Sequence, residues 1–215
     1  MNRRELFTAA TGSGACAPTC VGAQLIPNVL LRTHEGAQVR FYDDLVKGKQ
    51  VLINMMYVTC EGSCPAVTMR LVDIHRELAH RMGKDLFMYS ITLKPAEDGP
   101  AALKAYAQMH GALLPGWTFL TGDQFDIDTL RFALFRHDHI KFDLDLRGHT
   151  GKLRIINDAI NRWLHVPPLI SKESVLKRIA WADPPKDLAE RLRRNEQLQR
   201  EIDKEVELYG YRKVI

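Results

Sequence analysis

The sequence lacks a long apolar run, a block of one charge and an internal repeat. No stretch of about 18 or more apolar residues occurs, so we expect no transmembrane helix. The 30 Lys and Arg residues are interspersed with 26 Asp and Glu residues, and the formal charge is only +4. This balance argues against a nucleic-acid-binding protein. The four cysteines are too few for a disulfide framework, and their spacing does not resemble a four-ligand zinc ribbon.

The length of 215 residues and a hydrophobic content of 46% suit one domain with an appendage. Residues 1–25 are interpreted as a possible export signal and linker, because Arg3-Arg4 approximates a twin-arginine start and Ala15-Cys16-Ala17 would serve as a cleavage site. Cleavage there would remove Cys16 and leave Cys20. We therefore expect a periplasmic or otherwise exported protein, and a plain N-terminal tail on a cytoplasmic protein is the alternative.

Strand and helix patterns alternate through residues 26–182, which we expect to form one domain with an α/β fold and a central mixed sheet flanked by helices. The predicted elements are a hairpin at 29–33 and 37–41, strands at 51–58, 86–92, 117–120, 149–156 and 162–166, and helices at 65–82, 100–110, 126–135 and 171–179. Ser171 is the predicted N-cap of the last of these helices.

Residues 183–215 are predicted to form a charged helical extension after Pro184-Pro185. A helix over 186–209 would carry a thin apolar stripe, made of Leu188, Leu192, Leu198, Ile202 and Val206. The stripe favours a helix that packs on the domain or on a partner, and a solvated helical tail is the alternative.

The sequence Cys60-Glu61-Gly62-Ser63-Cys64-Pro65 follows a strand pattern and opens a helix pattern. The N–H groups at a helix N-terminus favour a thiolate, which binds soft metals and attacks disulfides. The pair therefore indicates metal or redox chemistry, and a plain disulfide or two buried thiols is the structural alternative. Cys16 and Cys20 repeat the spacing, but no strand precedes them, so we do not expect a second metal site there.

Four segments resemble the Sco/SenC family of copper proteins over residues 26–181. Residues 55–65 look like the metal loop of the family, 95–107 its second signature and 116–122 the segment that leads into the next helix. His149-Thr150, with the turn Asn157-Asp158 after it, resembles the position of the distal histidine. Two departures are Lys94, where the family usually has an acid, and the unusual stretch between Phe135 and His149.

The resemblance implies a thioredoxin-like fold and a copper site formed by Cys60, Cys64 and His149. Thiolates suit Cu(I), and an added imidazole gives a site that also holds Cu(II), whereas zinc would need a fourth ligand. The implied function is a copper chaperone for cytochrome oxidase assembly, with a cuproprotein acceptor such as an oxidase subunit and a thiol reductant as partners. His137 and His139 could supply a secondary metal contact, but we expect them to face solvent.

Two other functions use the same fold and thiols. A thiol–disulfide oxidoreductase would cycle Cys60 and Cys64 between dithiol and disulfide to reduce cysteines of a copper-protein acceptor. Three residues between the cysteines, rather than two, together with His149 favour metal binding. A peroxide-reducing relative is disfavoured, because the threonine and arginine partners of a peroxidatic cysteine are not evident. Three charged residues, Lys94, Asp98 and Lys104, could line the rim of the site, but we expect all three to be exposed charged surface.

Overall fold

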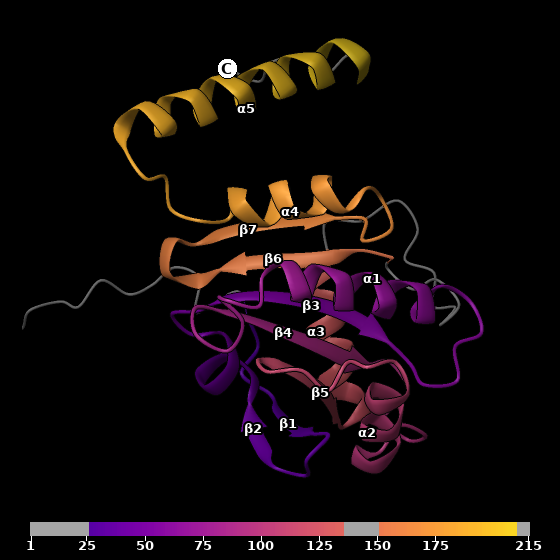
Figure 1. Ribbon diagram of the computed structural model, residues 1–215. Helices are drawn as coiled ribbons and strands as arrows, with labels where there is room; N and C mark the ends of the chain where they lie inside the picture. The colour runs from indigo at the N-terminus through magenta and orange to yellow at the C-terminus, as the bar shows by residue number, and fades with distance from the viewer. Residues whose placement is uncertain (1–25, 136–150, 210–215) are drawn as a thin grey trace, which may run out of the picture.

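The computed structural model describes residues 26–135 and 151–209, with side chains as far as Gln197 and at Arg200. Its strands form one seven-stranded sheet in the order β2-β1-β5-β4-β3-β6-β7 (Figure 1). The strands are β1 (Leu30–Thr33), β2 (Gln38–Arg40), β3 (Gln50–Met56), β4 (Leu86–Thr92), β5 (Trp117–Gly122), β6 (Leu153–Asn157) and β7 (Arg162–Val166). The α-helices are α1 (Ser63–Glu77), α2 (Pro100–Met109), α3 (Gln124–Phe135), α4 (Lys172–Trp181) and α5 (Leu188–Tyr209).

The sheet is mixed, as the sequence predicts. Its centre is parallel, because β4 pairs in parallel with both β3 and β5. Antiparallel hairpins close its two edges, β1–β2 beside β5 and β6–β7 beside β3. All seven residues of β3 are buried, which is why the strand reads as a continuous apolar run rather than an alternating one.

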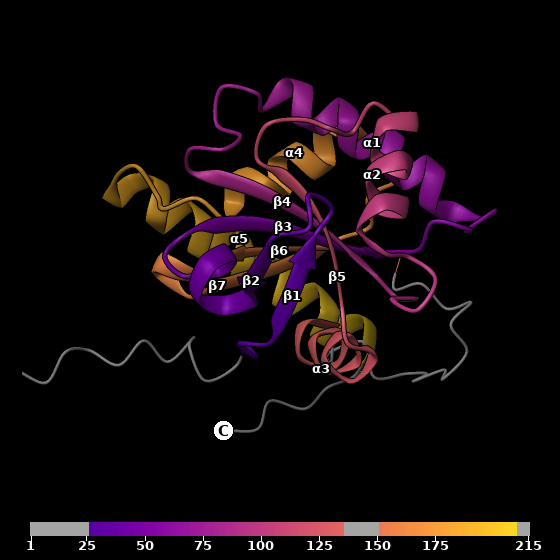
Figure 2. The same ribbon diagram turned by 90° about the horizontal axis from the view of Figure 1, so that it is seen from below.

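Helices cover both faces of the sheet, and each face has its own hydrophobic core (Figure 2). Helices α1, α2 and α4 pack on one face, and both cysteines belong to this core. Helix α3 and a π-helix, η2 (Phe41–Val46), pack on the other face. The layered α/β prediction is therefore confirmed, including the N-terminal hairpin and the C-terminal helix.

Several elements differ from the predicted ones, and three of the differences are larger than one or two residues or concern the site. The η2 turn was not predicted, although four of its six residues are buried. Helix α1 begins at Ser63 and ends at Glu77, whereas the pattern predicted 65–82. After it the chain continues through turns to Gly83, whose φ of 77° lies in the left-handed region. Strand β6 begins at Leu153, and the predicted strand residues His149 and Thr150 lie outside the described residues.

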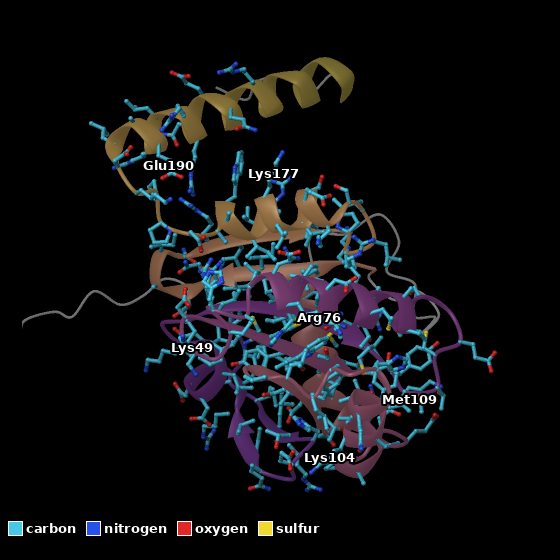
Figure 3. The ribbon with its side chains drawn as sticks, in the orientation of Figure 1. Lys49, Arg76, Lys104, Met109, Lys177 and Glu190 are labelled. Atoms are coloured by element: carbon cyan, nitrogen blue, oxygen red, sulfur yellow. The ribbon has the colours of Figure 1, made fainter. Side chains whose placement is uncertain are left out.

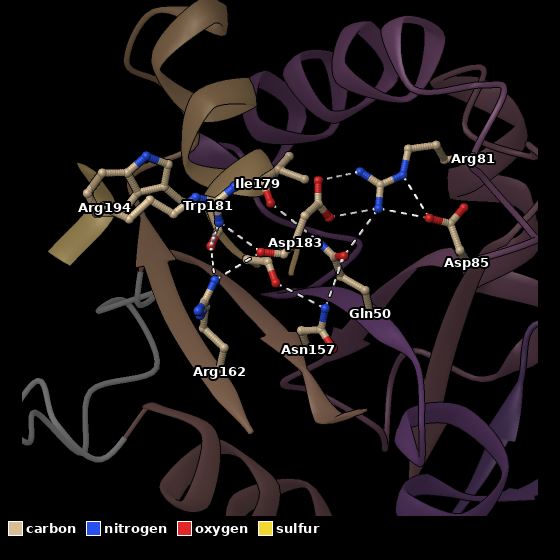
Figure 4. Close-up of polar contacts among 10 residues, drawn as sticks. Gln50, Arg81, Asp85, Asn157, Arg162, Ile179, Trp181, Asp183 and Arg194 are labelled. Atoms are coloured by element: carbon tan, nitrogen blue, oxygen red, sulfur yellow. Dashed lines mark hydrogen bonds and ion pairs between the residues drawn. The ribbon is translucent and has the colours of Figure 1, made fainter. Parts of the chain in front are cut away.

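A polar network ties the C-terminal extension to the end of the sheet where β3 begins (Figure 4). Arg81 donates to both carboxylate oxygens of Asp183, at 2.8 and 3.0 Å, and to Gln50 at 3.2 Å. Arg162 and Arg194 both donate to the backbone carbonyls of Trp181 and Asp183. These carbonyls follow the end of α4 and have no partner within that helix, so the guanidinium groups satisfy them.

The predicted cap of α4 is confirmed, because the Ser171 hydroxyl accepts the backbone N–H of Ser174 at 3.2 Å. Helix α5 is present but its apolar stripe does not pack on the domain at its beginning. Leu188 and Leu192 are 68% and 53% exposed. No helix within the described ranges 26–135 and 151–209 is long and apolar enough to span a membrane.

Candidate metal centre

The two thiols lie where β3 passes into α1, at the end of the sheet opposite the polar network. After β3, the backbone N–H of Cys60 donates to the carbonyl of Tyr57 at 3.3 Å, which closes a turn. Helix α1 then begins at Ser63, two residues before the predicted start at Pro65. Cys64 therefore lies in the first turn of the helix. Pro65 is tolerated there because no backbone N–H is needed in a first turn.

Cys60 and Cys64 are free thiols that hydrogen-bond to each other and are only 5% and 3% exposed. Burial, and to a smaller extent the hydrogen bond with Cys60, raise the pKa of the Cys64 thiol to about 12. The prediction that the helix N-terminus favours a thiolate is therefore wrong for Cys64 of the unliganded pair. Desolvation outweighs the helix dipole, since both sulfurs are enclosed in the core between α1 and the sheet.

Asp98 holds the loop before the cysteines in place, a role that the sequence did not reveal. Its carboxylate is 1% exposed and accepts the backbone N–H of Val58 at 3.0 Å and the Thr92 hydroxyl at 2.5 Å. The expectation of exposed charged surface is wrong for this residue. A signal was available in its position directly before Gly99-Pro100, where the chain must turn into α2.

The other two charged residues lie nearer the surface. Lys94 places its ammonium 4.8 Å from the ring centroid of Tyr57 and 3.5 Å from a Glu97 carboxylate oxygen. It therefore lies over the loop that leads to Cys60, as a rim residue would. Lys104 pairs with Glu35 at 2.9 Å on an exposed part of the surface and does not contribute to the site.

A small pocket beside Cys64 brings two distant parts of the chain together. Cys64 shares it with Gly151 and Lys152, which directly precede β6, and its remaining lining residues are Asn54, Met55, Ser63, Val67 and Pro168. The antiparallel pairing of β6 with β3 explains this approach, because Ile53 is opposite Arg154 and the chain before β6 runs toward the end of β3.

The predicted third ligand, His149, lies outside the described residues, as do His137, His139, Cys16 and Cys20. Within the described part of the chain, no group of three His, Cys, Asp or Glu residues could hold a metal ion. His75 is buried and its Nε2 lies 2.8 Å from the carbonyl of Pro115, and His110 packs on Tyr106. Both therefore have structural contacts of their own.

Comparison with known proteins identifies the family. The sequence profile of the SCO1/SenC family matches residues 28–182. The chain belongs to the SCO1/SenC family. A SCO1 protein homolog of Bacillus subtilis (strain 168) is 28% identical over 92 residues, which are 42% of this chain and 47% of that protein. The aligned region thus spans about half the length of this curated relative.

Solved structures of the family share the fold at low sequence identity. A SCO1/SenC family lipoprotein from Bacillus anthracis str. Ames has a TM-score of 0.61 at 19% identity, covering 73% of this chain and 94% of its own. ScoI of Bradyrhizobium japonicum with copper bound has a TM-score of 0.56 at 20% identity, covering 72% of this chain and 96% of its own. BsSco, a member of the Sco family of cytochrome c oxidase assembly proteins with a disulfide switch, has a TM-score of 0.57 at 19% identity. The alignment covers 72% of this chain and 90% of BsSco. The thioredoxin-like fold is thereby confirmed.

Proposed function

We propose that this protein is an exported copper-binding chaperone that delivers copper to a cytochrome oxidase or a related cuproenzyme. The observation that carries the proposal is the pair of buried thiols, Cys60 and Cys64, in hydrogen-bond contact at the start of α1. Two buried sulfur donors in contact, one of which lines a small pocket, suit a soft cation, and Cu(I) is the soft cation that two thiolates hold without further ligands.

The raised pKa of Cys64 fits a cargo site. A thiol with a pKa of about 12 keeps its proton at neutral pH, so copper must displace that proton when it binds. Proton displacement makes the net affinity lower than that of preformed thiolates and dependent on pH. A chaperone needs both properties, because it must collect copper and then release it to an acceptor by ligand exchange.

We propose His149 as the nitrogen ligand that completes the site. It precedes Gly151 by two residues, and Gly151 lines the pocket of Cys64. The nearness of His149 to Gly151 in the sequence supports this assignment. An imidazole would adapt the pair of thiolates to Cu(II) as well as Cu(I).

The family relatives support this function. ScoI of Bradyrhizobium japonicum has copper bound, and BsSco belongs to the cytochrome c oxidase assembly proteins. The Bacillus anthracis relative is a lipoprotein, which agrees with an exported chain that begins with Arg3-Arg4. A cuproprotein acceptor and a thiol reductant are the partners that such a chaperone requires.

A thiol–disulfide oxidoreductase is the second candidate, because the sulfurs of Cys60 and Cys64 are already in contact and BsSco has a disulfide switch. In that function the pair would pass two electrons to an acceptor disulfide and itself become a disulfide. With the pKa of Cys64 raised, Cys60 would have to be the attacking thiol in that reaction, and the three-residue spacing of the pair favours metal binding instead.

Anaerobic titration of reduced protein with Cu(I) against a competing chelator tests the proposal. We expect about one tightly bound copper per chain, and Cys60→Ser/Cys64→Ser should abolish it. Cys16→Ser/Cys20→Ser is a matched control with the same spacing and should bind as the unchanged protein does. Full copper uptake by Cys60→Ser/Cys64→Ser would refute the site, and copper-independent reduction of an acceptor disulfide would favour the oxidoreductase.

A further inference from the structure

Over its described side chains, which reach Gln197, α5 turns polar residues toward α4 and exposes Leu188 and Leu192. A groove of about 560 Å³ separates it from α4, and Lys177 of α4 and Glu190 of α5 lie in the space between the helices (Figure 3). Basic residues come from both helices, Lys177 and Arg178 from α4 and Arg193 and Arg194 from α5. Basic side chains outnumber Glu190 in this groove, which disfavours close packing of the two helices through these faces.

The outward side of α5 begins with Leu188 and Leu192, which are 68% and 53% exposed. At 3.6 residues per turn, both positions lie about 160° around the helix from Glu190, which lines the groove. The stripe therefore starts on the side of α5 that faces away from the domain, and a partner has to cover it if it is to be buried at all.

The spacing of the outward positions is that of a coiled coil. Alternating steps of four and three residues, starting from Leu188, mark one seam along the helix: Leu188, Leu192, Asn195, Gln199, Ile202, Val206 and Tyr209. Such a 4-3 repeat aligns a narrow apolar seam with a second helix. An interfacial membrane helix would instead carry a polar face rich in Lys and Arg, whereas α5 has five Arg and Lys residues against six Asp and Glu residues.

The residues that flank the seam are complementary to a second copy of the same helix. Arg191 and Glu196 lie on opposite flanks, five residues apart, at the g and e positions of this repeat. In a parallel two-stranded coiled coil, the g residue of one helix faces the e residue five positions later in its partner. A parallel pair of α5 helices would therefore form two Arg191–Glu196 contacts, one on each side of the seam.

We propose that α5 is a self-association helix that pairs in parallel with α5 of a second copy of this chain. The profile of the family ends at residue 182, so this surface lies outside the matched region and is independent of the copper site. Arg194 fixes the base of the helix through its bonds to the carbonyls of Trp181 and Asp183. Asn195 and Gln199 place two polar residues in the seam, which makes the dimer weak and its formation dependent on concentration.

Light scattering and sedimentation equilibrium of the reduced, copper-free full chain test the proposal. We expect a mass that approaches twice 24.5 kDa at high concentration and falls to one chain on dilution. Leu192→Glu should leave a monomer at every concentration. Phe125→Glu is a matched control, since Phe125 is 77% exposed on α3, and it should dimerise as the unchanged protein does.

Charge exchange tests the parallel orientation. Arg191→Glu should raise the dissociation constant roughly tenfold, because attraction becomes repulsion at two contacts. Adding Glu196→Arg to this variant should restore the dimer. A monomer at all concentrations, a dimer that survives Leu192→Glu, or a charge exchange that fails to restore association would overturn the proposal. Binding of the monomer to anionic phosphatidylglycerol vesicles, abolished by Leu192→Glu, would assign the stripe to a membrane surface and overturn it as well.

Discussion

Removal of the Asp98 carboxylate should loosen the loop that leads to the thiols. In Asp98→Ala, the backbone N–H of Val58 and the hydroxyl of Thr92 both lose their acceptor inside the protein. The 1% exposure of Asp98 leaves little room for water to replace it. Each buried donor without an acceptor costs about 1–3 kcal/mol, so the free energy of unfolding should fall by about 2–6 kcal/mol.

Thermal unfolding followed by circular dichroism measures this loss. For a domain of this size about 1 kcal/mol corresponds to roughly 2–4 °C in Tm, so the expected decrease is at least about 4 °C. Glu97→Ala is the matched control, because Glu97 is an exposed neighbour that pairs only with Lys94 on the surface. Asp98→Asn keeps the shape and one acceptor oxygen and should lie between the two.

Copper affinity provides the second measurement on the same variants. The Val58 N–H belongs to the loop that positions Cys60, so Asp98→Ala should weaken Cu(I) binding while Glu97→Ala leaves it unchanged. Equal Tm values for Asp98→Ala and Glu97→Ala would show that the buried carboxylate does not stabilise this loop. The reasoning from hydrogen bonds to loop geometry would then be refuted.

Three further predictions concern other residues. Burial lowers the pKa of His34 below 6.5, so in mild acid the unfolded chain binds a proton that the folded protein does not. The free energy of unfolding, measured with urea, should therefore fall as pH decreases from about 7 to 5. In His34→Asn this free energy should depend less on pH. Cu(II) binding should weaken more than Cu(I) binding in His149→Ala but not in the control His137→Ala, and the reverse outcome would move the nitrogen ligand. Gly116→Ala should lower Tm, because its φ is 72° and a Cβ would lie 2.3 Å from a backbone nitrogen; an unchanged Tm would contradict this close contact.

Regular elements with strong local signals could be predicted from the sequence. Strand β4 matches the predicted 86–92, and β7 matches 162–166, since both are short apolar or β-branched runs between turn residues. The Ser171 cap was also predictable, because a serine at that position has a local hydrogen-bonding partner. Such signals depend on neighbours in sequence, and they hold regardless of what the element packs against.

The missed features depend on contacts between distant parts of the chain. Asp98 reads as a surface charge beside Glu97, and only the approach of Val58 and Thr92 makes it a buried acceptor. The raised pKa of Cys64 likewise comes from enclosure by the core, which local helix-dipole reasoning does not include. For α5 the apolar stripe was evident, but its direction depends on how α5 lies against α4, which the sequence of the helix alone does not give.

The two proposals concern opposite ends of one buried strand. Gln50 begins β3 and joins the network that holds the extension, whereas Cys60 follows its other end. Seven strand residues at about 3.3 Å each separate the two by roughly 20 Å, and all seven are packed in the core. Pairing through the outward side of α5 would therefore leave the thiols of each copy in their own pocket. Copper uptake should be unchanged in Leu192→Glu, and self-association should persist in Cys60→Ser/Cys64→Ser, so either proposal can fail without the other.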